Sequence, residues 1–135
     1  MPGIGLFRLI YASRSRIGRE AAALATILAE ARANTAVAGI TGVLLHSPDG
    51  FAQVLEGSLA AVGATFERIQ NDPRHGEVAV LEAGPADARL FAGRTMAAVD
   101  GTAASDLARP VAADPAALLA LLHRLLAASS PAGGR

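Results

Sequence analysis

The chain has 135 residues, and its 12 basic and 12 acidic side chains give a formal net charge of zero at neutral pH. This length accommodates one domain, and the balanced charge gives no general attraction to nucleic acid or to anionic membranes. The absence of cysteine excludes disulfides, thiolate catalysis and cysteine-ligated metals.

The first predicted element is a strand over residues 6–11. It is an alternating, largely apolar run that lies between Gly5 and a polar stretch of serine and arginine. Successive side chains of a strand point to opposite faces. Tyr11, at the end of this strand, is therefore expected to point the same way as Phe7 and Leu9.

A helix is predicted over residues 18–33, because apolar side chains recur there at intervals of three and four residues: Leu24, Ile27, Leu28 and Ala31. Three residues further along the same stripe lies Asn34. We therefore expect the Asn34 side chain to face the core and not the solvent.

A hairpin is predicted next, because residues 39–46 and residues 51–57 are apolar runs separated by a short Pro-Asp-Gly segment. Both faces of the second run are mostly apolar, which is typical of a central strand covered on two sides. Gln53 is the exception, on the same face as Phe51 and Leu55. A buried amide without partners costs about 1–3 kcal/mol, so Gln53 must have something to bond to.

A second helix is predicted to begin at the N-cap Ser58 and to end before Asp72. Its expected inward stripe is Leu59, Val62, Phe66 and Ile69. Strands are predicted at residues 78–82 and 91–99, with Gly84-Pro85 in the turn between them. A leucine-rich helix is expected to begin at Asp114-Pro115, and residues 129–135 are expected to form a frayed end.

The order β-α-β-β-α-β, followed by one more strand, predicts an α+β ferredoxin-like sheet with two helices on one face. The C-terminal helix is expected to cover the other face of the sheet. Because that helix is apolar over nearly its whole circumference, it can also bury its outer side against a partner.

Polar side chains from three elements are expected to meet between the helices and the sheet: Tyr11, Asn34 and Gln53. Each has an ordinary structural explanation by itself, as a core ring, a helix cap or a surface amide. Together they favour a planar ligand with amide-like edges, such as a flavin ring. The histidines His46, His75 and His123 lie on different elements without metal-ligand spacing, so no metal site is expected.

The chain resembles the BLUF family, whose domains sense blue light with flavin. The resemblance extends over about residues 5–100. The matching segments are LFRLIYASRS, then Asn34 followed by GITGVLLHSPDGFAQVLEG, then NDPRH and Met96.

The resemblance implies roles for individual residues. Tyr11 would donate an electron and a proton to the excited flavin, and Gln53 would switch its hydrogen bonds. Asn34 would hold the carbonyl and imide edge of the ring, and Met96 would approach Gln53. Further flavin contacts are implied beside the ring, along the pyrimidine side and ribityl chain, and at the phosphate tail: Ser13, Asp72, Arg74, His75 and Arg68.

One position departs from the family pattern. Many relatives have tryptophan two residues before the methionine, where this chain has Arg94. A guanidinium does not suit a flavin pocket, so we expect Met96 to point inward and Arg94 to point outward.

These features predict a short stand-alone photoreceptor and not an enzyme, with FAD preferred to FMN. Residues 1–100 would bind flavin, and residues 101–135 would form a linker and a helical cap or interaction segment. With no effector domain encoded, the signal would pass to a separate protein or through a homo-oligomer formed by the sheet face or the C-terminal helix.

No signal peptide or bilayer-spanning stretch is evident, so a cytoplasmic protein is expected, without direct binding to nucleic acid or membrane. Two alternatives remain open at this point. One is a flavin-binding redox subunit without light signalling, and the other is a ferredoxin-like protein-interaction module.

Overall fold

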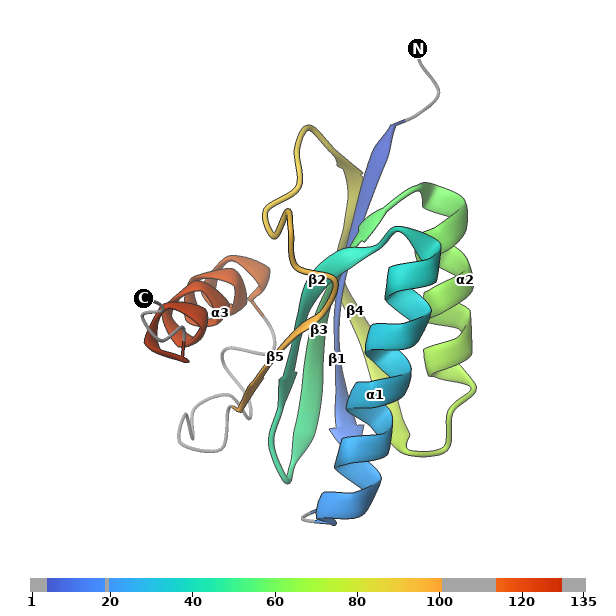
Figure 1. Ribbon diagram of the computed structural model, residues 1–135, viewed down its shortest axis with the longest axis vertical. Helices are drawn as coiled ribbons and strands as arrows, with labels where there is room; N and C mark the ends of the chain where they lie inside the picture. The colour runs from blue at the N-terminus through green and yellow to red at the C-terminus, as the bar shows by residue number, and fades with distance from the viewer. Residues whose placement is uncertain (1–4, 19, 101–113, 130–135) are drawn as a thin grey trace.

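The computed structural model of the chain describes residues 5–18, 20–100 and 114–129. Within them, one sheet lies between helices on its two sides, with α1 and α2 on one side and α3 on the other (Figure 1). The elements in chain order are β1 (Leu6–Ser15), α1 (Ala21–Ala38), β2 (Thr41–His46), β3 (Gly50–Gly57), α2 (Leu59–Gln70), β4 (His75–Ala86), β5 (Ala97–Asp100) and α3 (Pro115–Ser129).

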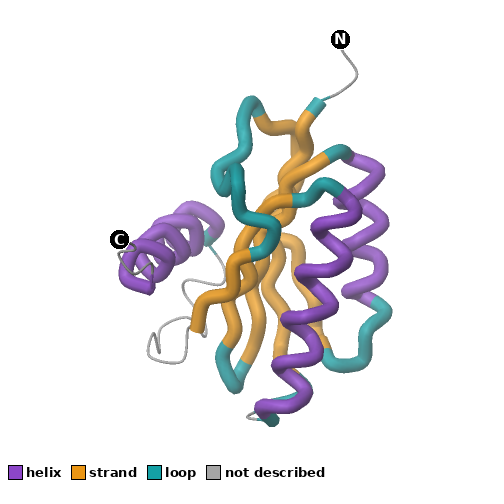
Figure 2. The backbone as a smooth tube through the Cα atoms, in the orientation of Figure 1, coloured by secondary structure: helices purple, strands orange, loops and turns teal. Residues whose placement is uncertain are grey.

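The sheet has the strand order β4-β1-β3-β2-β5. Neighbouring strands are antiparallel except for β2 and β5, which pair in parallel. Figure 2 shows helices α1 and α2 side by side on the same face of the sheet. This arrangement confirms the predicted α+β ferredoxin-like fold, with β5 as the additional strand.

Each face of the sheet has its own hydrophobic core. On the α1 and α2 side, Leu9 and Tyr11 of β1 pack with Leu55 of β3. On the α3 side, Ile10 and Val54 pack against leucines of α3, so α3 covers this face as predicted. The alternation of side chains along β1 and β3 therefore divides the core into two layers.

Strand β1 is longer than predicted and continues to Ser15. The polar residues that were expected to end the strand pair with neighbouring strands instead, Ser13 with Phe51 of β3 and Ser15 with His75 of β4. Tyr11 therefore lies in the middle of β1 and not at its end. Its register partner on β3 is Gln53.

The predicted turn at Gly84-Pro85 is wrong, because both residues lie within β4. They pair with Arg8 and Phe7 of β1. Proline cannot donate a backbone hydrogen bond, but β4 is an edge strand, where a missing donor is tolerated.

The predicted strand over residues 91–99 is also wrong in its first part, because β5 begins only at Ala97. The Glu56 carboxylate, which is fully buried, accepts the backbone N–H groups of Leu90 and Phe91 and the Nε of Arg8. The connection from β4 to β5 is therefore held by hydrogen bonds to a side chain of β3, and it is not itself a strand of the sheet. Gly93 adds a positive φ of 84° that interrupts an extended chain.

The helices begin and end for identifiable reasons. The Ser58 hydroxyl accepts the N–H of Ala61 at the start of α2, and α1 ends at Gly39 with a left-handed φ of 72°. Leu59 was predicted to face inward but is 61% exposed, because it is the first residue of α2. In the described part of the chain, no helix has the length and apolar character that crossing a membrane requires.

The predicted start of the C-terminal helix is confirmed. The Asp114 carboxylate accepts the N–H groups of Ala116 and Ala117, as an N-cap does. The predicted linker at residues 101–113 and all but the first residue of the expected frayed end lie outside the described residues.

Candidate functional site

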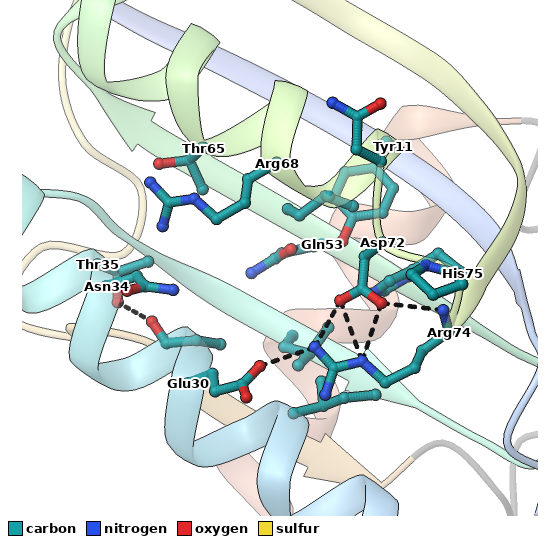
Figure 3. A pocket seen from close by; sticks show the side chains of 16 residues that line it. Tyr11, Glu30, Asn34, Thr35, Gln53, Thr65, Arg68, Asp72, Arg74 and His75 are labelled. Carbon is teal, nitrogen blue, oxygen red and sulfur yellow. Dashed lines mark hydrogen bonds and ion pairs between the residues drawn. The ribbon is translucent and has the colours of Figure 1, made fainter.

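A cavity of about 540 Å³ lies between α1, α2 and the sheet, within the size range of small-molecule sites. Tyr11, Leu44 and Gln53 contribute from the sheet. The walls come from α1, from α2 and from the segment that joins α2 to β4. Figure 3 shows the polar side chains of these elements converging on the cavity.

Tyr11 and Gln53 form the polar part of the cavity's floor. They are directly opposite each other on β1 and β3, and the Tyr11 hydroxyl donates to Gln53 Oε1 at 2.5 Å. Gln53 is only 3% exposed. The prediction that this buried amide requires a partner is confirmed, and the partner is Tyr11.

Met96 supplies the second partner of the Gln53 amide. Gln53 Nε2 donates to the Met96 sulfur at 3.2 Å, and Met96 is buried. Arg94 is exposed. The expected arrangement, with Met96 inward and Arg94 outward, is confirmed.

The Tyr11 phenol is held in its protonated form. Burial raises the pKa of Tyr11 well above its ordinary value, and the negative charge of Asp72 raises it further. The ring also packs against Phe66, with 5.5 Å between ring centroids. At neutral pH the hydroxyl is therefore a hydrogen-bond donor.

Three charged side chains form a linked group at the edge of the cavity. Arg74 donates to both carboxylate oxygens of Asp72, and its Nη2 also lies 2.7 Å from Glu30 Oε1 on α1. The hydrogen bond from Arg74 holds the pKa of the Asp72 carboxyl below its ordinary value. The Arg74 charge is thus shared between two carboxylates.

Arg68 contrasts with Arg74. It lines the cavity from α2, is exposed, and makes no hydrogen bond or ion pair among the described residues. Its guanidinium remains available for an anionic group at the cavity mouth.

Ser13 pairs with His75, which is part of the cavity wall. The Ser13 hydroxyl lies 3.0 Å from His75 Nδ1, and the His75 ring packs against Phe51 with 4.6 Å between centroids. Burial lowers the pKa of His75; the Asp72 charge opposes this shift, and the Arg74 charge adds to it. His75 lines the cavity, whereas Ser13 contacts it only through His75.

Asn34 lines the cavity, so the prediction that it lies on the inner side of α1 is confirmed, but it is exposed, so the prediction that it does not face the solvent is wrong. Helix α1 continues beyond it, and the next residue, Thr35, is the buried one. Asn34 lies near the mouth, where its amide points into the cavity in Figure 3.

Comparison with known families matches residues 6–97 to BLUF, described as sensors of blue light using FAD. The chain belongs to the BLUF family. Its predicted family membership is therefore confirmed.

Solved structures of BLUF proteins are similar over nearly the whole chain. The dark-state structure of BlrB is 34% identical with a TM-score of 0.80, covering 95% of this chain and 99% of BlrB. The BlsA ground state is 30% identical with a TM-score of 0.77, covering 90% of this chain and 87% of BlsA. Both structures match this chain as a whole and not only in its flavin-family segment.

Curated relatives include the photoactivated adenylate cyclase subunit beta of Euglena gracilis, 35% identical over 86 residues. The match covers 64% of this chain but only 10% of the cyclase subunit. The chain thus spans about a tenth of the length of the curated relatives it matches.

The structure brings most of the predicted BLUF site residues to one cavity. Tyr11, Asn34 and Gln53 line it, as do Arg68, Asp72, Arg74 and His75, while Met96 and Ser13 lie directly behind lining residues. Sequence reasoning missed Glu30, Thr35 and Thr65. Glu30 lies one helical turn before Asn34 on the same face of α1, and that spacing could have revealed it.

Proposed function

We propose that the chain holds its flavin in the cavity between α1 and α2 and signals through the Tyr11–Gln53 hydrogen bond. The observation that carries this proposal is the buried sequence of contacts from Tyr11 to Gln53 to Met96. It joins the Tyr11 phenol to the Gln53 amide, whose nitrogen donates to the Met96 sulfur. The cavity above it suits a planar, largely apolar ring.

Several residues have the chemistry to hold a flavin there. The Asn34 amide can pair with the carbonyl and imide edge of the ring, since it carries both a donor and an acceptor. Asp72, Arg74 and His75 would flank the pyrimidine side and the ribityl chain, with Ser13 supporting His75. Arg68 would contact the phosphate tail.

We propose FAD in preference to FMN. The family description names FAD, whereas a similar structure, BlrP1 of Klebsiella pneumoniae, is described with FMN and cyclic diGMP. Asn34, Gln53 and Tyr11 would contact the ring that both cofactors share.

A bound flavin would supply an oxidant when it absorbs blue light. Tyr11 would be the source of the electron and of the hydroxyl proton that this oxidant takes up, and its raised pKa keeps the proton on the phenol beforehand. Without that proton, Gln53 Oε1 would lose its donor and the amide would be free to rotate. Return of the electron and the proton to Tyr11 would leave the hydrogen bonding of Gln53 as the net change.

The signal would leave through the last elements of the chain. Met96 directly precedes β5, and α3 packs on the opposite face of the sheet. We propose that residues 1–100 bind flavin and that the segment beyond them presents the change to a separate protein or to a second copy.

The visible spectrum of the purified protein before and after blue light tests the light-sensing mechanism. We expect flavin bands that shift to the red and return in the dark. Tyr11→Phe and Gln53→Leu should retain flavin and abolish the shift. Gln70→Leu, which removes an exposed amide from α2, should leave it unchanged.

The outcomes separate the alternatives. Normal photocycling in either site variant contradicts the assigned roles of Tyr11 and Gln53. A yellow protein without a reversible shift supports a redox subunit, and a colourless protein that refuses added flavin contradicts flavin binding itself.

A further inference from the structure

Thr35 makes a contact that ordinary helix formation does not require. Its side chain is 1% exposed, and its hydroxyl oxygen lies 2.7 Å from the carbonyl oxygen of Ala31 and 2.8 Å from that of Thr95. A third carbonyl, that of Arg32, lies at 3.3 Å. A hydroxyl has a single proton to donate, so these carbonyls compete for it.

The Thr95 carbonyl belongs to the segment that positions Met96. Thr95 directly precedes Met96, whose sulfur accepts the hydrogen bond from Gln53. Arg32 Nε donates to the Met96 carbonyl at 3.4 Å, which is a second contact between α1 and the same segment. Helix α1 therefore contacts two backbone carbonyl groups of the Met96 segment, whereas Gln53 contacts the Met96 sulfur.

Thr26 provides the comparison within the same helix. Its hydroxyl donates to the Ala22 carbonyl at 3.1 Å, one turn earlier, and its side chain is exposed. Threonine in a helix commonly makes this bond to its own backbone. Thr35 differs from Thr26 in having an acceptor on another element, 60 residues away in sequence.

We propose that Thr35 is a positioning residue that couples the flavin-binding helix α1 to the Met96 segment. The proposal rests on the proposed function and gives the cavity a second connection to β5. The first runs from Gln53 to Met96. The second runs from Asn34 through its neighbour Thr35 to Thr95, so a displacement of Asn34 by the ring changes where Met96 is held. Donation to Ala31 releases the segment, and donation to Thr95 holds it.

The variant that isolates this contact is Thr35→Val, which preserves side-chain shape and removes the hydroxyl. Thr26→Val is the matched control, and Thr35→Ser restores the hydroxyl. Met96 and Met1 are the two methionines of the chain, so methyl-¹³C methionine labelling gives an NMR signal for Met96 that Met96→Leu identifies.

We expect Thr35→Val to shift the Met96 methyl resonance in the flavin-free protein. In the flavin-bound protein it should change the rate of dark recovery by about two- to tenfold, the range set by the net value of one hydrogen bond. Thr35→Ser should restore both quantities, and Thr26→Val should alter neither.

The coupling is overturned if Thr35→Val leaves both the resonance and the recovery rate unchanged, or if Thr26→Val changes them equally. If Thr35→Val does not fold, the same measurements are made on Thr35→Ala, because alanine has the highest helix propensity of all residues. The Met96 resonance requires no flavin. Failure to bind flavin would therefore contradict the proposed function while the Thr35 contact is still tested.

Discussion

The Gln53 amide is suited to two arrangements because its present partners differ in strength. Its oxygen accepts a short bond from the Tyr11 hydroxyl, whereas its nitrogen donates to the Met96 sulfur, which is a weak acceptor. Rotating the amide would point the nitrogen toward Tyr11 and the oxygen toward Met96. The rotation would give up the weak bond to sulfur and would replace the Tyr11–oxygen bond with one in which the Gln53 nitrogen donates to the Tyr11 oxygen.

Arg68 should determine how strongly the phosphate of the cofactor is bound. Because Arg68 has no partner among the described residues, Arg68→Gln should weaken FMN binding by about fivefold, the upper range for an exposed charge pair. Riboflavin lacks the phosphate, so its affinity should be unchanged. Quenching of flavin fluorescence during titration measures both affinities.

Arg124→Gln provides the control for this experiment, because Arg124 is an exposed arginine on α3, across the sheet from the cavity. It should leave both affinities unchanged. An equal loss of FMN and riboflavin binding in Arg68→Gln would contradict a phosphate contact.

The predictable site residues were those whose type is unusual for their position. Gln53 is conspicuous in an apolar strand, and its need for a partner follows from the cost of burying an amide. Glu30 and Thr35 are not unusual in type, since charged residues and threonine are ordinary on a helix, and only the spacing of Glu30 from Asn34 pointed to the site. Their importance arises only from Arg74 and Thr95, which are distant in sequence.

At the level of elements, the pairing of β2 with β3 depends on the absence of a side chain at Gly42. A Cβ atom built there would lie 1.8 Å from the Val54 carbonyl oxygen. Gly42→Ala should therefore destabilise the protein by about 1–3 kcal/mol or more, because the β3 backbone must move. Chemical denaturation measures this free energy of unfolding.

Gly63 is the matched control for Gly42. It lies within α2, and a Cβ atom there would meet no atom within 4 Å. Gly63→Ala should stabilise the protein by up to about 1 kcal/mol through helix propensity. If both substitutions change stability in the same direction, close packing at Gly42 is not the cause.

Periodicity predicted the elements whose apolar residues recur at the spacing of a helix or of a strand. Helix α1 and strands β2 and β3 belong to this group. The β4–β5 connection could not be predicted, because the backbone N–H groups of Leu90 and Phe91 bond to Glu56, more than 30 residues earlier. A contact with a residue so distant in sequence produces no periodic pattern of apolar residues in the segment itself.

For the whole molecule, the sheet separates the cavity from the surface that α3 covers. Phe91 packs into the core beneath α3 and stacks on His123, with 4.9 Å between ring centroids. Phe91 and Met96 lie on the same short connection but contact opposite sides of the sheet. A change at Met96 therefore has a covalent path of five residues to the face that carries α3.

Stability should fall as the solution becomes more acidic than about pH 6.5. Burial lowers the pKa of both His75 and His46 below the ordinary 6.5, although Asp72 and Asp100 oppose these shifts. The unfolded chain then binds more protons than the folded chain, so the free energy of unfolding decreases as pH falls. Each histidine contributes at most about 1.4 kcal/mol per pH unit.

Urea denaturation at a series of pH values measures this dependence. The double variant His46→Gln/His75→Gln should show a flatter profile between pH 6.5 and the onset of carboxylate protonation at lower pH. If the free energy of unfolding of the double variant keeps the original dependence on pH, groups other than His46 and His75 are responsible for it.

The burial of Tyr11 has a consequence for optical work on this protein. Tyr11 is the single tyrosine, and the chain has no tryptophan. Apart from the weak phenylalanine bands, the near-ultraviolet absorption of the polypeptide comes from the one ring that is bonded to Gln53. Near-ultraviolet circular dichroism of the flavin-free chain therefore reports on that ring almost alone, as a built-in optical probe at the centre of the site.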